Sequence, residues 1–167
     1  MKLFKLIAMT MIMSLVLVGC SSNSKKKDGS ASDSVVDDSA MNNPLELNGS
    51  SDQSTAGGLQ TIYFDFDSSS LSAAGRSTLE MNASFLKDNS SVDVQVEGHC
   101  DERGGEQYNL ALGERRARAI KDYLVALGVE SGRISIISFG KTTPLEFGHD
   151  ESAWSRNRRG NFVITAK

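Results

Sequence analysis

A charged, glycine-rich stretch holds the residue types best suited to chemistry in this sequence. It runs from Glu97 to Gly105 and reads EGHCDERGG, with Asp101 near its centre. Arg116 follows fifteen residues after Asp101, about two turns into the helix expected next. A carboxylate and a guanidinium held a few ångströms apart could bind a group that carries both an ammonium and a carboxylate, because the planar guanidinium bonds both carboxylate oxygens. On the residue types alone, a plain Asp101–Arg116 salt bridge or a solvated helix face is the stronger interpretation.

The elements that must position these residues belong to an α/β domain covering residues 59–167. Thr61–Phe66 is aromatic and β-branched, which favours a strand, and Ser72 is suited to cap a helix over 73–87. Valines at every second position of 92–96 alternate with polar residues, as in a half-buried strand.

The second half of the domain continues this alternation of helix and strand. A helix is expected over 109–127, where small and apolar residues recur at helical spacing and Gly128 is placed to end it. Two further strands are expected at Arg133–Phe139 and Phe162–Thr165. The order β-α-β-α-β-β predicts a two-layer α/β sandwich, in which two main helices pack on a mixed four-stranded sheet.

The N-terminal residues have the pattern of an export signal. Two lysines precede the apolar run Leu6–Val18, whose thirteen positions are too few for a spanning helix of about 20 residues. The run leads into the letters LVGC, which resemble the bacterial lipobox and imply that residues 1–19 are a lipoprotein signal peptide and that Cys20 is lipidated. Ser21 in place of an aspartate favours the outer membrane by the same resemblance. The alternative is an ordinary export signal in which Cys20 has no role.

The segment between the anchor and the domain is predicted to be a flexible polar tether. Residues 20–58 are rich in Ser, Asn, Asp, Lys and Gly, and contain no aromatic residue. Such a chain buries too little apolar surface to offset the entropy lost on ordering. We therefore expect lipidated Cys20 and a tether here, which would let the domain move away from a membrane surface.

Residues 59–167 contain several recognisable segments: 97–105, Tyr108–Leu110, Leu112–Ala117, Phe139-Gly140, Pro144 and Asn157-Arg158-Arg159. Together these segments closely resemble the OmpA-like domain, and the lipobox makes its peptidoglycan-associated lipoprotein (Pal) branch the best match. This resemblance implies a cofactor-free protein that binds cell-wall stem peptides without cleaving them. It also implies an anchor on the periplasmic face of the outer membrane, and periplasmic Tol proteins as partners in envelope integrity and cell division.

The resemblance also assigns roles to individual residues. Asp101 would take the ammonium and Arg116 the carboxylate of a diaminopimelate-type stem peptide. Removing either side chain should then abolish binding and leave thermal unfolding near normal. The further residues implied in the site are Phe64, Asp65, Arg103, Asn109 and Leu112. Phe64 could equally belong to the core, and capping the second helix is the safer role for Asn109. The Asn157-Arg158-Arg159 turn could serve only to pair acids across the domain.

Other chemistries receive less support from the sequence. Cys100 departs from the family pattern, and a small buried residue is favoured over a thiol that forms an intermolecular bond. Neighbouring strand residues point to opposite faces, so His99 and Cys100 are poorly placed to bind one metal ion, and no metal site is expected. A net charge of −3 and a pI near 5.4 argue against a nucleic-acid partner.

The competing function is a wall-cleaving hydrolase. Acidic residues at 65, 67, 97 and 101 could supply the paired carboxylates that such an enzyme needs. The sequence has no serine-elbow motif, and its two histidines are fifty residues apart, so it lacks the remaining parts of a hydrolase. Binding without cleavage is the preferred prediction.

Overall fold

A computed structural model describes residues 44–167 of the chain. The predicted signal peptide, the lipidation site at Cys20 and the first part of the predicted tether lie outside the described residues. Within residues 44–167, no helix combines the length and the apolar character needed to span a bilayer.

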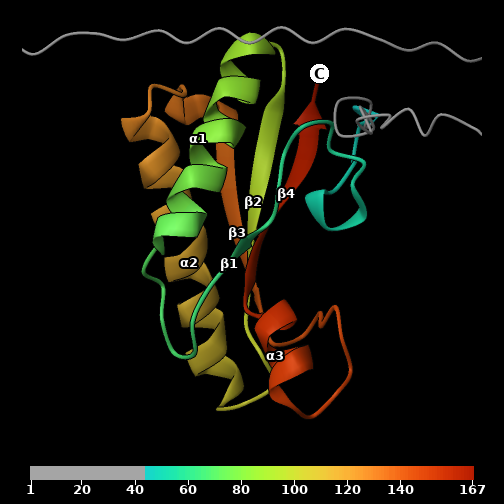
Figure 1. Cartoon of the computed structure of the whole chain (residues 1–167), viewed down its shortest axis with the longest axis vertical. Coiled ribbons are helices and arrows are strands. Elements are labelled where there is room, and N and C mark those ends of the chain that lie inside the picture. The colour runs from blue at the N-terminus through green and yellow to red at the C-terminus, as the bar shows by residue number, and fades with distance from the viewer. Residues whose placement is uncertain (1–43) are drawn as a thin grey trace, which may run out of the picture. The chain divides into compact units, whose positions relative to one another are not determined.

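Four strands form one mixed sheet in the order β1-β4-β2-β3 (Figure 1). The central strand β2 runs parallel to β3 and antiparallel to β4, and β1 is antiparallel to β4. The strands are β1 (Ile62–Tyr63), β2 (Asp93–His99), β3 (Ile134–Gly140) and β4 (Arg159–Ala166).

Two long helices cover one face of this sheet (Figure 1). They are α1 (Ala73–Asp88) and α2 (Glu106–Ala126), and they enclose the core against β2 and β4. Ser72 caps α1 as predicted, since its side chain accepts a hydrogen bond from the N–H of Gly75 (3.0 Å). The predicted two-layer sandwich is therefore confirmed.

The structure adds a short helix that the sequence did not predict. Helix α3 (Glu151–Asn157) follows β3 and precedes β4 along the chain. It packs at the end of the sheet where β2 ends (Figure 1). Asp150 caps it by accepting from the N–H groups of Ser152 (2.9 Å) and Ala153 (3.1 Å). An Asp before a Glu is a known start signal, but a helix of two turns carries too little periodicity to detect.

The first strand is shorter and the second helix longer than predicted. Only Ile62–Tyr63 of the predicted 61–66 strand pairs as a strand, because the chain then turns, with Asp67 in a left-handed conformation (φ 50°). Helix α2 begins at Glu106, three residues before the predicted start. Gly105, which offers no side-chain cap, precedes it, so the predicted capping role of Asn109 is wrong.

Residues 44–58 are packed on the domain, and the predicted flexible tether is wrong for this part. The N–H of Asn48 donates to the carbonyl of Ile164 (2.9 Å), and Ile164 N–H donates to the carbonyl of Gly49 (3.0 Å), which extends the β4 edge beyond β1. The Asp52 carboxylate then pairs with Arg159 (2.7 Å), where both side chains are nearly buried. Specific polar partners order this segment together with Ala56, which is buried in the core, and Leu45, which packs against it, so composition alone misjudged it.

Two glycines bring α2 against the end of β2 at backbone contact. A Cβ atom on Gly98 would lie 1.8 Å from the carbonyl oxygen of Gly113, and one on Gly113 would lie 2.7 Å from the carbonyl oxygen of Gly98. Only glycine at both positions permits this approach. The contact sets the distance between the first turns of α2 and the loop that follows β2.

Candidate ligand-binding site

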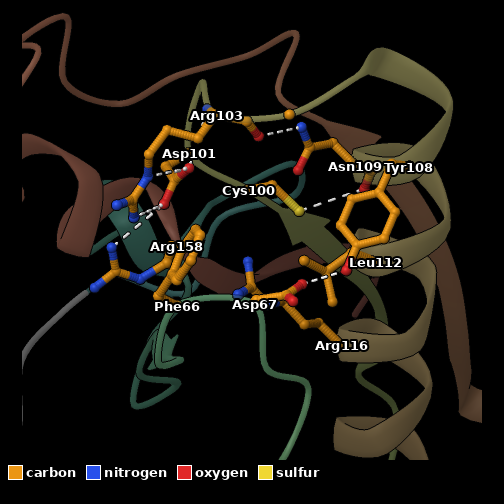
Figure 2. A pocket seen from close by; sticks show the side chains of 11 residues that line it. Phe66, Asp67, Cys100, Asp101, Arg103, Tyr108, Asn109, Leu112, Arg116 and Arg158 are labelled. Carbon is orange, nitrogen blue, oxygen red and sulfur yellow. Dashed lines mark hydrogen bonds and ion pairs between the residues drawn. The ribbon is translucent and has the colours of Figure 1, made fainter.

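A pocket of about 150 Å³ opens where β2 ends and α2 begins (Figure 2). Its walls come from the β1–α1 loop, the loop after β2, the first turns of α2 and the residue just before β4. The lining residues are Phe66, Asp67, Cys100, Asp101, Arg103, Gly104, Tyr108, Asn109, Leu112, Arg116 and Arg158. The structure thus brings Asp101 and Arg116 into one cavity, as the resemblance implied.

Local geometry explains how α2 contributes three buried residues to the lining, in addition to the exposed Tyr108. Asn109, Leu112 and Arg116 are spaced by three and four positions, so they share one face of the helix and point toward the loop after β2. All three are buried. The strand end supplies Cys100 and Asp101 from the opposite side.

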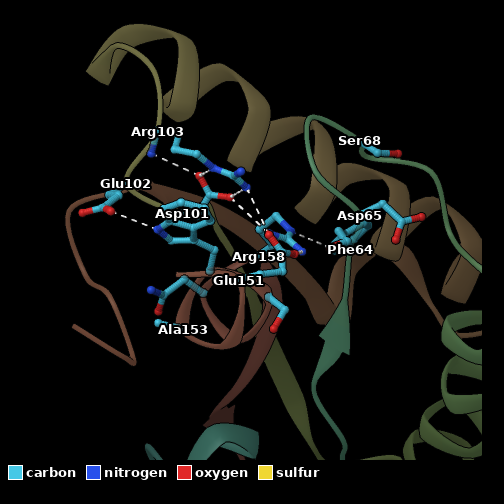
Figure 3. A network of polar contacts seen from close by, with 12 residues as sticks. Phe64, Asp65, Ser68, Asp101, Glu102, Arg103, Glu151, Ala153 and Arg158 are labelled. Atoms are coloured by element: carbon cyan, nitrogen blue, oxygen red, sulfur yellow. Dashed lines mark hydrogen bonds and ion pairs between the residues drawn. The ribbon is translucent and has the colours of Figure 1, made fainter. Parts of the chain in front are cut away.

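The Asp101 carboxylate is surrounded by donors (Figure 3). Arg103 donates from its backbone N–H (3.1 Å), Nε (3.2 Å) and Nη2 (2.6 Å), and Arg158 donates from Nη1 (3.3 Å). Burial alone would raise the pKa of Asp101, but the hydrogen bonds from both arginines outweigh it and lower that pKa below its ordinary value. Asp101 is therefore a stable negative charge.

Arg116 is a buried cation held only by backbone carbonyls. Its side chain is 1% exposed, and it donates from Nε to Ser68 (2.8 Å), from Nη1 to His99 (2.7 Å) and from Nη2 to Asp65 (3.0 Å). No carboxylate of residues 44–167 lies within 4.0 Å of its guanidinium. Burial lowers the pKa of Arg116, yet an arginine side chain stays protonated in proteins. A buried positive charge thus faces the pocket without an anionic partner.

Cys100 and Asn109 brace the loop after β2. The Cys100 thiol donates to the Asn109 carbonyl (3.3 Å), and Asn109 Nδ2 donates to the Arg103 carbonyl (2.8 Å). Burial raises the pKa of the Cys100 thiol, which keeps it protonated and a poor nucleophile. The interpretation of Cys100 as a small buried residue is confirmed, with its side chain 3% exposed.

Two residues implied in the site do not line the pocket. Phe64 is buried in the core beneath the Arg116 guanidinium, whose carbon lies 5.1 Å from the Phe64 ring centroid. Asp65 contributes its backbone carbonyl to Arg116, and the residue itself is exposed. The lining positions are the next two, Phe66 and Asp67, because the turn at Asp67 carries the chain over the pocket mouth.

Sequence reasoning also missed Tyr108, Arg158 and Trp154. Tyr108 lines the pocket and bonds Asp67 through its hydroxyl, which raises the pKa of Tyr108. Arg158 lies in the Asn157-Arg158-Arg159 turn that the resemblance singled out, and it pairs with Asp101 and Glu151 across the domain. Trp154 approaches Asp101 only through Arg103, a contact that no spacing in the sequence reveals.

The histidines have separate partners. His99 lies near Glu97 (3.3 Å) and Thr143 (3.0 Å), whereas exposed His149 lies near Glu102 (2.8 Å). Among residues 44–167, no group of three His, Cys, Asp or Glu side chains is placed to hold a metal ion.

Comparison with known proteins identifies the family and relatives of this chain. Residues 63–158 match the OmpA family. Peptidoglycan-associated lipoproteins from Pseudomonas aeruginosa and Mesorhizobium japonicum are 41% and 40% identical, covering 95% and 92% of this chain and 95% and 88% of their own lengths.

Solved structures give the same result. The peptidoglycan-associated lipoprotein of Burkholderia pseudomallei superposes with a TM-score of 0.61 at 40% identity, over 62% of this chain and 88% of that one. The C-terminal domain of Helicobacter pylori MotB shares the fold at 20% identity, with a TM-score of 0.61 over 66% of this chain and 87% of that one. The chain therefore belongs to the OmpA family and resembles its peptidoglycan-associated lipoproteins.

Proposed function

We propose that this protein binds the peptide stems of peptidoglycan without cleaving them and so links the outer membrane to the cell wall. The observation that carries the proposal is the buried Arg116 guanidinium, which faces a pocket containing Asp101 and has no carboxylate partner among residues 44–167. The relatives of this chain are named for association with peptidoglycan, which supports the same ligand class.

The charges in the pocket suit a zwitterionic ligand. Arg116 uses three of its five N–H groups on backbone carbonyls, which leaves two for a carboxylate from the ligand. A carboxylate there would supply the missing counter-charge in a site of low dielectric, where such pairing is strong. Asp101 offers the complementary negative charge for an ammonium. A diaminopimelate end carries both groups on one carbon.

The apolar part of the pocket fits the remainder of such a ligand. Leu112, together with the rings of Phe66 and Tyr108, forms the walls between the two charges. Asn109 is already bonded to the loop and therefore shapes the pocket rather than capping the helix. We assign Asp101 to the ammonium, Arg116 to the carboxylate and Leu112 to packing against the ligand's methylene chain.

Neither Asp101 nor Glu97 has the raised pKa expected of the acid in a glycoside hydrolase. Such an enzyme needs one carboxyl group of raised pKa to protonate the leaving group. The pKa of Asp101 is lowered, and so is that of Glu97: burial would raise it, but hydrogen bonds from His99 and Asn161 outweigh burial. We therefore propose a role in binding and not in catalysis.

The resemblance to the family supports our proposals for the membrane anchor and the protein partners. We propose that Cys20 carries the lipid that holds the protein on the periplasmic face of the outer membrane. We further propose that the protein works with periplasmic Tol proteins in envelope integrity and cell division. The similarity to peptidoglycan-associated lipoproteins extends over 95% of the chain, which includes the region of the predicted lipobox.

Changing Asp101→Asn should reduce wall binding at least tenfold, since a neutral amide removes the charge that the ammonium needs. The measurement is co-sedimentation of the protein with purified, intact cell-wall sacculi, followed by a search for released soluble fragments. Because hydrogen bonds from both arginines lower its pKa, Asp101 stays ionised at mildly acidic pH. Loss of wild-type binding through protonation of Asp101 should therefore be centred below the ordinary aspartate pKa of about 3.9.

The matched control is Asp122→Asn, which removes an exposed carboxylate from α2 at a distance from the pocket lining. It should bind sacculi as the wild type does. Wild-type sedimentation of Asp101→Asn would contradict the site, and release of muropeptides would favour the hydrolase.

The anchor has its own test. Changing Cys20→Ser should leave the protein unlipidated, so it should be recovered in the soluble periplasmic extract. Fractionation of wild type and variant with washed outer membranes measures this directly. Continued membrane association of the variant would show that something other than this lipid anchors the protein.

A further inference from the structure

Arg103, which lines the pocket, is clamped between two aromatic rings. Its guanidinium carbon lies 3.9 Å from the ring centroid of Phe66 and 4.1 Å from that of Trp154. Trp154 is itself held by a hydrogen bond from its indole N–H to Glu102 (2.9 Å). Two aromatic faces and a carboxylate, here Asp101, are the usual components of a site for an organic cation.

The acceptor capacity of Asp101 is already filled. Four N–H groups point at its two oxygens, and a carboxylate has about four lone-pair sites. A ligand ammonium therefore cannot reach Asp101 unless one of the present donors leaves.

The Arg103 side chain is the donor best able to leave. Arg158 is 7% exposed and is also tied to the Phe64 carbonyl (3.0 Å) and to Glu151. The Arg103 side chain is 30% exposed, and in the described part of the chain its one other ion-pair partner is Glu151 at 3.9 Å. If the Arg103 guanidinium swings out, its backbone N–H and Arg158 still hold Asp101 in place.

We propose that Arg103 is an internal stand-in for the ligand's ammonium: it occupies the cage formed by Asp101, Phe66 and Trp154 when the pocket is empty, and the ligand's ammonium replaces it. This inference rests on the proposed binding of stem peptides and refines the role of Arg103, which becomes a competitor of the ligand. The free protein thereby keeps a buried carboxylate neutralised.

The exchange has a consequence for selectivity. A ligand with a free ammonium can take over the bonds that Arg103 gives up, whereas a ligand without one leaves Asp101 short of donors or must bind beside Arg103. Arg103 thus lowers the affinity for every ligand that needs the cage, and it discriminates most strongly against ligands that lack the positive charge.

The first test measures the binding of two probes by calorimetry. One is the tripeptide L-Ala-D-Glu-meso-diaminopimelate, and the other is the same peptide acetylated on its side-chain amine. Arg103→Ala should bind the free-amine probe about tenfold more tightly than the wild type does, since no resident cation must be displaced. The acetylated probe should bind weakly to both proteins, with no gain in the variant.

The matched control is Arg118→Ala, which removes an exposed arginine of α2 that pairs with Glu114 and does not line the pocket. It should bind both probes as the wild type does. Arg103→Gln, which retains a polar side chain, serves as a second variant if the alanine protein folds poorly.

The second test needs no wall ligand. Trp154 is the only tryptophan of the chain, so its fluorescence reports on the cage. Millimolar guanidinium ion should change the fluorescence of Arg103→Ala in a saturable way, because it can fill the emptied cage. The wild type should not respond.

The outcomes separate the two proposals. Weaker or equal binding of the free-amine probe by Arg103→Ala would overturn the inference, because Arg103 would then contact the ligand or play no part. An equal gain for both probes would also overturn it, since simple obstruction would explain that result. If no protein binds either probe but guanidinium still fills the cage, the cage is supported and the proposed wall ligand fails. If guanidinium has no effect on Arg103→Ala either, the cage fails too.

Discussion

Replacing Arg116 by alanine is expected to abolish wall binding and also to destabilise the domain strongly. The sequence had suggested that thermal unfolding would stay near normal, but Arg116 proves to be fully buried. Its guanidinium joins the carbonyls of Asp65, Ser68 and His99, which belong to two separate segments. Hydrogen bonds from a charged group contribute about 1.5–3 kcal/mol each, and the His99 carbonyl would be left buried without this donor, so a loss of roughly 3 kcal/mol or more is expected. Urea unfolding followed by circular dichroism measures it.

Two further arginine variants isolate the cause. Arg118→Ala removes an exposed arginine two positions along the same helix and should change stability by no more than about 0.5 kcal/mol. Arg116→Lys keeps the positive charge but loses the planar fork, so it should be intermediate in stability and still weak in binding. An Arg116→Ala protein as stable as the wild type would show that the three carbonyls find other donors or water.

Changing Gly98→Ala is expected to be the most damaging single methyl addition in the domain. The new Cβ would lie 1.8 Å from the Gly113 carbonyl oxygen, and neither group belongs to a flexible side chain. Relief therefore requires α2 to move away from β2 as a body. Overpacking of this kind typically costs 1–3 kcal/mol and sometimes more, and we expect about 3 kcal/mol in urea unfolding.

The same variant should weaken ligand binding beyond its effect on folding. Moving α2 displaces Leu112 and Arg116, which flank Gly113, from the pocket. Gly132→Ala is the control, because a Cβ there meets nothing within 4 Å, and its stability should stay within about 0.5 kcal/mol of the wild type. If Gly98→Ala matched the wild type in stability and binding, the contact between β2 and α2 would have to be looser than the structure shows.

The elements that the sequence predicted well are those with a strong period. The alternating valines at positions 92, 94 and 96, in β2 and just before it, are buried. Helix α1 begins at its predicted cap. Gly128 follows α2 with φ 94°, as an α2 terminus requires. These features depend on local spacing, which a sequence displays directly.

The features that were missed depend on partners distant in the chain. Asp52 and Arg159 are far apart in sequence, and neither suggests by itself that residues 44–58 are ordered. The clamp on Arg103 joins the β1–α1 loop, the loop after β2 and helix α3. Polar contacts of this kind have no period, so only the three-dimensional arrangement reveals them.

The site itself was predicted in part. Resemblance brought Asp101 and Arg116 together, and the pocket contains both. It could not show that Asp101 already has arginine partners, or that Phe66 rather than Phe64 forms the wall. Those details follow from the turn at Asp67 and from the packing of α3.

If the proposed lipid at Cys20 tethers the protein, the attachment of residues 48–52 has a mechanical consequence. A pull along the chain from that side would meet the folded domain first at Leu45, which packs against the core and whose carbonyl accepts from Lys167. It would then reach β4 through the Asn48–Ile164 hydrogen bond and the Asp52–Arg159 pair. Arg159 is the direct neighbour of Arg158, which holds Asp101. Tension transmitted to Arg159 would thus enter the sheet next to Arg158, which supports the carboxylate proposed to bind the ligand. The force on the anchor and the force on the bound wall would then act on two consecutive residues.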